Sequence, residues 1–278
     1  MLAFFLKEFD EDWVNFLKNV GVESFIFIKS EDRKVLEEEN VKVIFSNDIS
    51  SEIKKFGIKT IFIDYEIDVK FSNVENIKII ENEFEKEIFK GYDAYALRRE
   101  KVEGFIYLPY FFDFNYFSSF TSKFKIFERK RRILILLKNV TVDLATIFEK
   151  VIPLLKNNFE IVFYRIELAN RKNMIFINRK LEKEERAKLY YFSSAIFVFE
   201  NFKKEVLEAM SMGKFVYTLD SCFDSLKFSL RDDLLQKIKK AISFGGFYFD
   251  MIEKARKFSI ENSSKIFRKE LEGIKLFK

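Results

Sequence analysis

Short apolar runs alternate with charged segments along the first half of the chain, and this alternation constrains the fold most. The runs are rich in Ile, Val and Phe and are short enough to be buried strands. The candidate strands are Leu2–Leu6, Ser24–Ile28, Val41–Phe45, Thr60–Asp64 and Ile77–Ile80. The charged segments between them carry apolar residues at helical spacing, and they are Glu11–Asn19, Glu31–Glu39 and Ser50–Lys55. Strands and helices that alternate in this way predict a parallel, Rossmann-like sheet.

The same pattern begins again after a strand-like run, Phe105–Leu108, and an aromatic stretch. The second set of candidate strands is Ile133–Leu137, Glu160–Tyr164, Met174–Ile177, Ala195–Phe199 and Phe215–Leu219. The candidate helices are Leu144–Leu155, Glu182–Phe192, Lys204–Met212, Asp232–Ile242 and Asp250–Leu276. A chain of 278 residues is long enough for two domains. We therefore predict an α/β protein with two Rossmann-like domains facing a cleft: an N-terminal domain, 1–117, a basic linker, 118–132, and a C-terminal domain, 133–278.

The composition excludes several kinds of chemistry. The chain has no His, a single Cys and eight Gly. Without His there is no Ser-His-Asp triad and no imidazole metal site. Cys222 alone cannot form an internal disulfide, which fits a reducing compartment, and we expect it to be a packing residue. The glycines do not form the usual phosphate-binding motifs. We expect neither a bound metal nor a cofactor, and chemistry that rests on carboxylates, amines, guanidinium groups, hydroxyls and backbone dipoles.

The net charge of +5 is concentrated in one segment. Lys123–Arg132 holds six basic residues and one acidic residue, so the rest of the chain is balanced. The segment could contact an anionic membrane surface, contact nucleic acid, or form a solvated linker. The balance elsewhere argues against a nucleic-acid-binding protein. We expect a cytoplasmic protein, because the sequence shows neither a signal peptide nor an apolar run of about 20 residues. Abundant Lys, Glu and Ile with one Gln is typical of thermophiles.

A set of short motifs in the second half occurs in a characteristic order. The apolar run Ala195–Phe199 leads into Glu200, and Glu208-Ala-Met-Ser-Met-Gly213-Lys-Phe-Val216 follows. The further motifs are Leu108–Phe117, Asn173–Asn178, Glu184–Tyr190, Ala255–Ser259 and Ile266–Leu271. In this order and spacing, residues 104–278 resemble the GT-B glycosyltransferases, in particular the large retaining family numbered four.

This resemblance implies the transfer of a hexose from a nucleoside-diphospho-sugar to an unknown acceptor, with retention of configuration and without a metal. The donor would bind the C-terminal domain and the acceptor the N-terminal domain, and the last helix would pack back onto the N-terminal domain. A helix N-terminus near Lys203 would stabilise the departing diphosphate, together with basic side chains.

The resemblance also assigns candidate site residues. It places Glu200 at the hydroxyls of the donor sugar as the catalytic carboxylate, and Glu208 at the ribose hydroxyls. A carboxylate suits a diol because its two oxygens can accept two hydrogen bonds. Donor-binding positions also fall on Asn201, Phe202 and Lys203, and on Lys138 after the first strand of the domain. The alternative interpretation is that both Glu residues are ordinary surface residues and that Lys138 is a solvated strand cap.

A second hypothesis is a catalytically inactive, GT-B-like binding or interaction protein. The glycines that let the backbone approach the phosphates in the family are replaced here by Asn201 and Lys203. The His that many family members place near the donor has no counterpart in this chain. Turnover of a donor distinguishes the two hypotheses.

Overall fold

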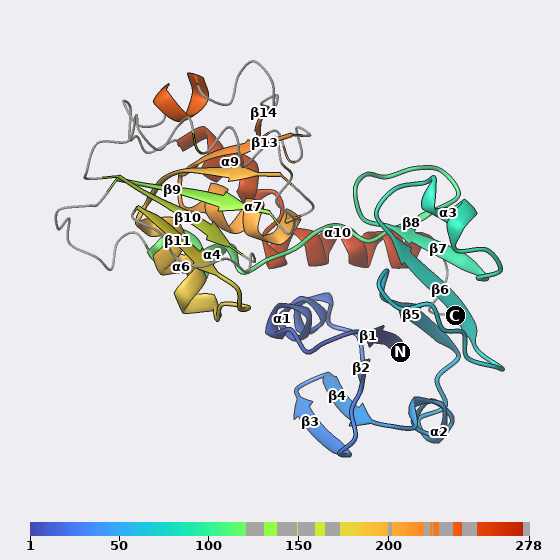
Figure 1. The fold of residues 1–278 in the computed structure, drawn as a ribbon. Helices are drawn as coiled ribbons and strands as arrows, with labels where there is room; N and C mark the ends of the chain where they lie inside the picture. Colours follow the sequence, from blue (N-terminus) through green and yellow to red (C-terminus); the bar gives the residue numbers. More distant parts are fainter. Residues whose placement is uncertain are drawn as a thin grey trace. The chain divides into compact units, whose positions relative to one another are not determined.

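The chain divides into two compact units. The computed structural model describes residues 1–120, 131–137, 149, 159–164, 173–199, 202–219, 223, 225–227, 236–240 and 249–274 (Figure 1). Unit 1 consists of Met1–Phe111 and the segment that starts at Ile260, and unit 2 consists of Phe112–Ser259. The sequence placed the first boundary at Phe117, whereas the structure places it at Phe111. Of the predicted linker, residues 118–120 belong to a helix, 131–132 belong to a strand, and 121–130 lie outside the described residues.

Unit 1 is built on an eight-stranded sheet with the order β3-β4-β2-β1-β5-β6-β7-β8. The strands are β1 (Leu2–Leu6), β2 (Ser24–Lys29), β3 (Lys34–Glu38), β4 (Val41–Ser46), β5 (Thr60–Ile63), β6 (Glu75–Ile80), β7 (Ala94–Leu97) and β8 (Ile106–Tyr107). Every neighbouring pair is parallel except β3 and β4. All five strands expected in this half are present, and the prediction of a mainly parallel α/β sheet is confirmed.

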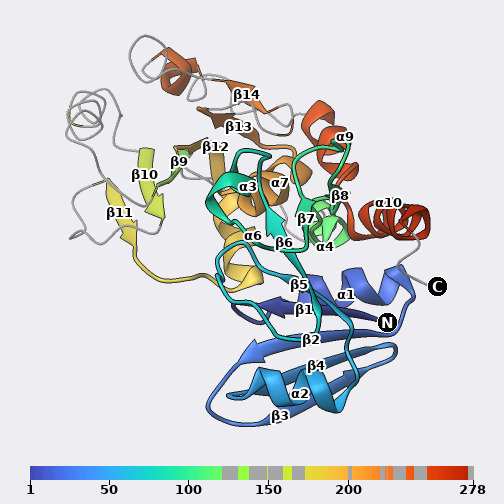
Figure 2. The same cartoon turned by 90° about the vertical axis from the view of Figure 1, so that its right-hand side faces the viewer.

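One predicted helix of unit 1 is wrong. The segment Glu31–Glu39 was expected to be helical, but it contains β3, which pairs antiparallel with β4 at the edge of the sheet (Figure 2). Glu39 adopts a positive φ of 51° in the tight turn between the two strands. Val35 and Leu36 pack against the buried clusters of unit 1, because successive strand residues point to opposite faces. The hairpin therefore partly buries both apolar residues, which overrides their helix-like spacing.

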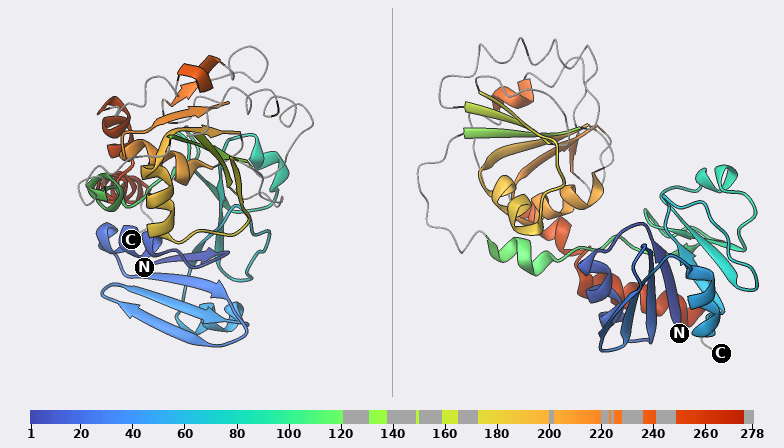
Figure 3. Two further views of the ribbon diagram at one scale, coloured as in Figure 1. Left: turned by 60° about the vertical axis from the view of Figure 1, so that its left-hand side comes forward. Right: turned by 60° about the horizontal axis from the view of Figure 1, so that its bottom comes forward.

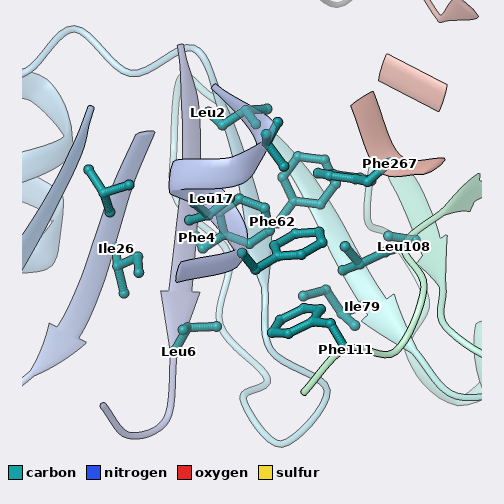
Figure 4. Packing of buried hydrophobic residues seen from close by; sticks show 14 of the residues in the cluster. Leu2, Phe4, Leu6, Leu17, Ile26, Phe62, Ile79, Leu108, Phe111 and Phe267 are labelled. Atoms are coloured by element: carbon teal, nitrogen blue, oxygen red, sulfur yellow. The ribbon is translucent and has the colours of Figure 1, made fainter. Parts of the chain in front are cut away.

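Helices cover both faces of the unit 1 sheet. Helices α1 (Glu11–Val20) and α10 (Ile260–Gly273) pack against each other on one face, and α2 (Ile49–Lys55) contributes to the core on the other. The short helix α3 (Glu85–Ile88) precedes β7. On the first face Phe4 stacks on Phe62 with ring centroids 4.8 Å apart, and Phe267 of α10 packs against both rings (Figure 4). The last helix is thus part of the core of unit 1.

Unit 2 is built on a six-stranded parallel sheet with the order β11-β10-β9-β12-β13-β14. The strands are β9 (Arg131–Leu136), β10 (Phe159–Tyr164), β11 (Met174–Ile177), β12 (Ser193–Val198), β13 (Phe215–Thr218) and β14 (Leu226–Lys227). The helices are α4 (Phe114–Phe120), α6 (Lys183–Tyr191), α7 (Lys203–Ser211) and α9 (Phe249–Arg256). Helices α6 and α7 pack side by side against one face of this sheet (Figure 3).

The structure corrects the prediction of one long C-terminal helix, Asp250–Leu276. The helix is interrupted between α9 and α10, where Phe258 and Ser259 form turn hydrogen bonds back to Ala255 and Arg256. The carbonyl of Phe258 also accepts a hydrogen bond from the backbone N–H of Phe112. The chain passes from unit 2 to unit 1 at this interruption.

Two predicted helices of the second half are only partly covered by the structure. The predicted helix Leu144–Leu155 lies outside the described residues except for Glu149, and only residues 236–240 of Asp232–Ile242 are described. Among the described helices, none combines the length and the apolar character needed to cross a bilayer.

Candidate functional site

The strand order of unit 2 defines the place where a ligand is expected. The first strand of this sheet, β9, lies in its middle. The strands β10 and β11 follow on one side of β9, and β12, β13 and β14 then follow on the other side. The loops after β9 and β12 therefore leave the same edge of the sheet, between neighbouring strands. The backbone N–H of Phe199 donates to the carbonyl of Leu136 at 3.0 Å, which joins the two strand ends. In open α/β sheets, ligands bind outside the carboxyl ends of the strands at such a reversal.

Most of the predicted site residues belong to these two loops. Lys138 follows β9, and Glu200 and Asn201 follow β12, but these three residues lie outside the described residues. Phe202 is described and is buried, with 3% of its surface exposed, so its side chain belongs to the core. Lys203 is partly exposed and is the first residue of α7. The loop after β12 thus leads directly into a helix N-terminus, whose free N–H groups and dipole favour an anion.

Glu208 lies in the second half of α7 and is fully enclosed. Its exposed fraction is 0%. Arg186 of α6 donates a hydrogen bond to each carboxylate oxygen, with Nη2 2.7 Å from Oε1 and Nε 2.9 Å from Oε2. The hydroxyl of Tyr190 donates a third hydrogen bond to Oε2 at 3.0 Å. We call these three residues the Arg186–Glu208–Tyr190 cluster.

The electrostatics of this cluster follow from its burial. Burial raises the pKa of the Glu208 carboxyl group, and the Arg186 guanidinium opposes that shift. Burial also raises the pKa of Tyr190 well above its usual value, and the Glu208 carboxylate adds to the shift, so the phenol stays protonated as a donor. A two-pronged guanidinium–carboxylate pair in a low-dielectric interior is strong once formed, and breaking it by removing one partner is costly.

The cluster bears on the predicted role of Glu208. Its hydrogen bonds fasten α6 to α7 next to the sheet edge that carries the candidate site. Contact of Glu208 with a ribose remains a prediction, and it would require the ion pair with Arg186 to open. The sequence contained one signal for the partners: Arg186 and Tyr190 are four residues apart, so they share a face of α6. That spacing alone does not identify the acidic residue that accepts their hydrogen bonds.

The basic segment Lys123–Arg132 is described only at its end. Arg132 lies in β9 and donates to Glu160 of the neighbouring β10, with Nη2 2.8 Å from Oε2. The positive charge of Arg132 is therefore paired within the sheet of unit 2. Residues 121–130 lie outside the described residues, and membrane contact through them remains a prediction.

Comparisons with known proteins bear on the fold. No protein-family model and no curated protein matches the chain. Among solved structures, the trehalose-6-phosphate synthase OtsA is similar, with a TM-score of 0.69, 8% identity and coverage of 98% of both chains. A glycosyltransferase from Rickettsia africae has a TM-score of 0.64, 10% identity and coverage of 99% of this chain and 98% of that one. Anabaena HepE in complex with UDP and glucose has a TM-score of 0.61, 10% identity and coverage of 98% and 99%.

These neighbours establish the architecture. The likenesses extend over nearly the whole length of both chains, and the two parallel sheets described above agree with them. The chain has the GT-B fold, so the predicted fold class is confirmed. A fold can host more than one activity, so the activity of this chain depends on its own site residues.

Proposed function

We propose that the protein transfers a sugar from a nucleoside-diphospho-sugar donor to an acceptor hydroxyl. The observation that carries the proposal is the sheet edge of unit 2, where β9 and β12 end side by side and α7 begins at Lys203. Glycosyltransferases among the structural neighbours, and the UDP and glucose bound by HepE, support it.

In the proposed reaction the bond between the anomeric carbon and the diphosphate oxygen breaks, and its electron pair leaves with the nucleoside diphosphate. The acceptor hydroxyl oxygen forms the new bond to the anomeric carbon, and its proton is released. Negative charge grows on the diphosphate, so groups that stabilise an anion accelerate the reaction. We assign this task to the N-terminus of α7 with Lys203 and to Lys138, and we assign the donor sugar hydroxyls to Glu200. Retention of configuration and independence of metal ions are part of the proposal.

We propose a supporting role for Glu208 in this site. Because its carboxylate is held by Arg186 and Tyr190, it fixes α7 against α6. The position of the α7 N-terminus then depends on a buried ion pair rather than on the donor.

The same observation favours a second candidate, a GT-B-like binding protein without turnover. The carboxylate that the family resemblance assigns to the ribose is occupied by the protein's own Arg186, and the glycines expected beside the phosphates are absent. Such a protein would bind a nucleotide sugar weakly or not at all, and would not cleave it.

Release of nucleoside diphosphate from UDP-glucose, GDP-glucose and ADP-glucose tests the proposal, with a mixture of sugars and sugar phosphates as acceptors. We expect release from one donor, and a loss of at least tenfold in Lys203→Ala and Glu200→Gln. The control Lys257→Ala changes an exposed lysine of unit 2. Binding without release would favour the non-catalytic candidate, and equal rates in Lys203→Ala and Lys257→Ala would refute the assigned anion site.

A further inference from the structure

Arg98 of unit 1 has an unusual environment. It follows β7 at the carboxyl edge of the sheet, and its side chain is only partly exposed. The centre of its guanidinium lies 4.4 Å from the ring centroid of Tyr110, 5.5 Å from that of Phe111 and 5.8 Å from that of Trp13. Within the described part of the chain, its Nε is buried and has no hydrogen-bond partner.

A buried donor without an acceptor needs a physical explanation. Buried N–H groups are nearly always paired, and an unsatisfied one in a native protein often marks a place where a water, an ion or a ligand binds. Aromatic rings attract the flat face of a guanidinium, whereas its five N–H donors lie in its plane. The three rings therefore hold the cation without giving its Nε an acceptor. A planar fork of this kind matches the oxygens of phosphate and carboxylate groups.

The position of Arg98 in unit 1 also points to a ligand. The strand order of unit 1 reverses at β1, which lies between β2 and β5, so Lys7 and Asp64 mark the switch point of this sheet. The backbone N–H of Lys7 donates to Oδ2 of Asp64 at 3.2 Å. Asp64 lies within electrostatic reach of Arg98. Trp13, which contacts Arg98, belongs to the helix that follows β1.

The side chains at this edge combine an anionic, an aromatic and a cationic group. Asp64 supplies carboxylate oxygens that accept hydrogen bonds from hydroxyls, and Tyr65 is an exposed aromatic side chain on the same loop. Arg98 supplies a cation that the described residues leave without an ion-pair partner at Nε. A polyhydroxylated molecule with one anionic group would use all of them.

We propose that Arg98 binds the anionic group, phosphate or carboxylate, of a sugar that docks at the carboxyl edge of the unit 1 sheet. This inference rests on the proposed function, for which it names the acceptor class: a sugar phosphate or a uronic acid. Asp64 accepts hydrogen bonds from the hydroxyls of that sugar. The competing explanation is that Arg98 is a packing residue, held by the three aromatic rings alone.

Calorimetric titration of the full chain tests the assignment, with glucose 6-phosphate, glucuronate and glucose as separate probes. We expect at least one anionic sugar to bind more tightly than glucose at equal ionic strength. We expect Arg98→Gln to weaken that binding at least tenfold. Arg99→Gln is the matched control, because it removes the same charge from the next residue, which is exposed, and it should bind as the wild type does.

Three results would overturn the inference: neither anionic sugar binds the wild type, glucose binds as tightly as they do, or Arg98→Gln binds them as the wild type does. A melting temperature lowered by Arg98→Gln with unchanged sugar binding would identify a packing residue. UDP, GDP and ADP are titrated into the same preparations. Nucleotide binding without binding of anionic sugars refutes this inference alone. Anionic sugar binding without nucleotide binding refutes the proposed function, and with it the acceptor role, but leaves Arg98 as an anion-binding residue.

Discussion

The Arg186–Glu208–Tyr190 cluster allows a sharp prediction about the stability of unit 2. The Arg186 side chain is 12% exposed and that of Glu208 is 0% exposed. Arg186→Met therefore leaves a carboxylate enclosed without its cation. Removing one partner of a buried pair costs about 3–5 kcal/mol. Tyr190→Phe removes one hydrogen bond to a charged group and should cost about 1.5–3 kcal/mol.

The stability lost in Arg186→Met depends on pH, and the burial of Glu208 decides whether the loss grows or shrinks as the pH rises. Burial already raises the pKa of the Glu208 carboxyl group, and removing Arg186 raises it further, because the guanidinium opposed the shift. A carboxyl group with a raised pKa in the folded state binds its proton more tightly there than in the unfolded state. The variant should therefore be least destabilised at acidic pH, and its deficit should grow as the pH rises through the pKa of the unfolded group.

Urea unfolding between pH 4 and pH 8, with separate fits for the transitions of the two units, measures both effects. Arg179→Met is the matched control: Arg179 is exposed and pairs with the partly exposed Glu185 of α6, so its loss should cost far less stability. The double variant Arg186→Met/Glu208→Leu removes both charges and should recover most of the loss. Equal losses in Arg186→Met and Arg179→Met would refute the buried pair.

Further predictions concern unit 1. Burial lowers the pKa of Lys78 to about 8, and its ammonium donates to the carbonyls of Asp64, Tyr65 and Ile67. Because the unfolded group keeps its usual pKa of 10.5, the unfolding free energy of the wild type should rise by about 3 kcal/mol relative to Lys78→Met between pH 8 and pH 10.5. A pH series of urea unfolding curves without that difference would show that the lysine is not buried as described. Phe267→Ala should destabilise unit 1 by about 3–5 kcal/mol, because the ring is 0% exposed. The neighbouring Ile266→Ala, at a side chain 41% exposed, should change the stability by less than about 0.5 kcal/mol; urea unfolding of both variants measures the difference.

The sequence predicted the fold where local pattern and tertiary context agree. The apolar runs Leu2–Leu6 and Ile133–Leu137 are buried on both faces, as parallel strands between helix layers are, so their composition alone identifies them. The sequence does not predict the strand Ala94–Leu97, because Ala-Tyr-Ala-Leu has none of the Ile, Val or Phe that mark the other runs. The apolar residues of Glu31–Glu39 at helical spacing predict a helix, but pairing with β4 decides its structure.

The sequence predicts a site at the ends of β9 and β12, and that location stays a prediction; the contacts of its described residues could not be predicted. Strand order places the ends of β9 and β12 side by side, and Lys203 begins the helix that follows β12, whereas Lys138 and Glu200 lie outside the described residues. The partner of Glu208 depends on how α6 packs against α7, which no local spacing specifies. The environment of Arg98 could not be predicted either, because the rings that contact it, those of Trp13, Tyr110 and Phe111, come from other parts of the sequence.

Calorimetric titration of the full chain with UDP, GDP and ADP tests the central claim, that unit 2 binds a nucleoside diphosphate where α7 begins. We predict that one of the three binds, that Lys203→Ala weakens its binding at least tenfold, and that Lys257→Ala leaves it unchanged. If none of them binds, or if Lys203→Ala binds as tightly as Lys257→Ala, the sheet edge between β9 and β12 is not a diphosphate site.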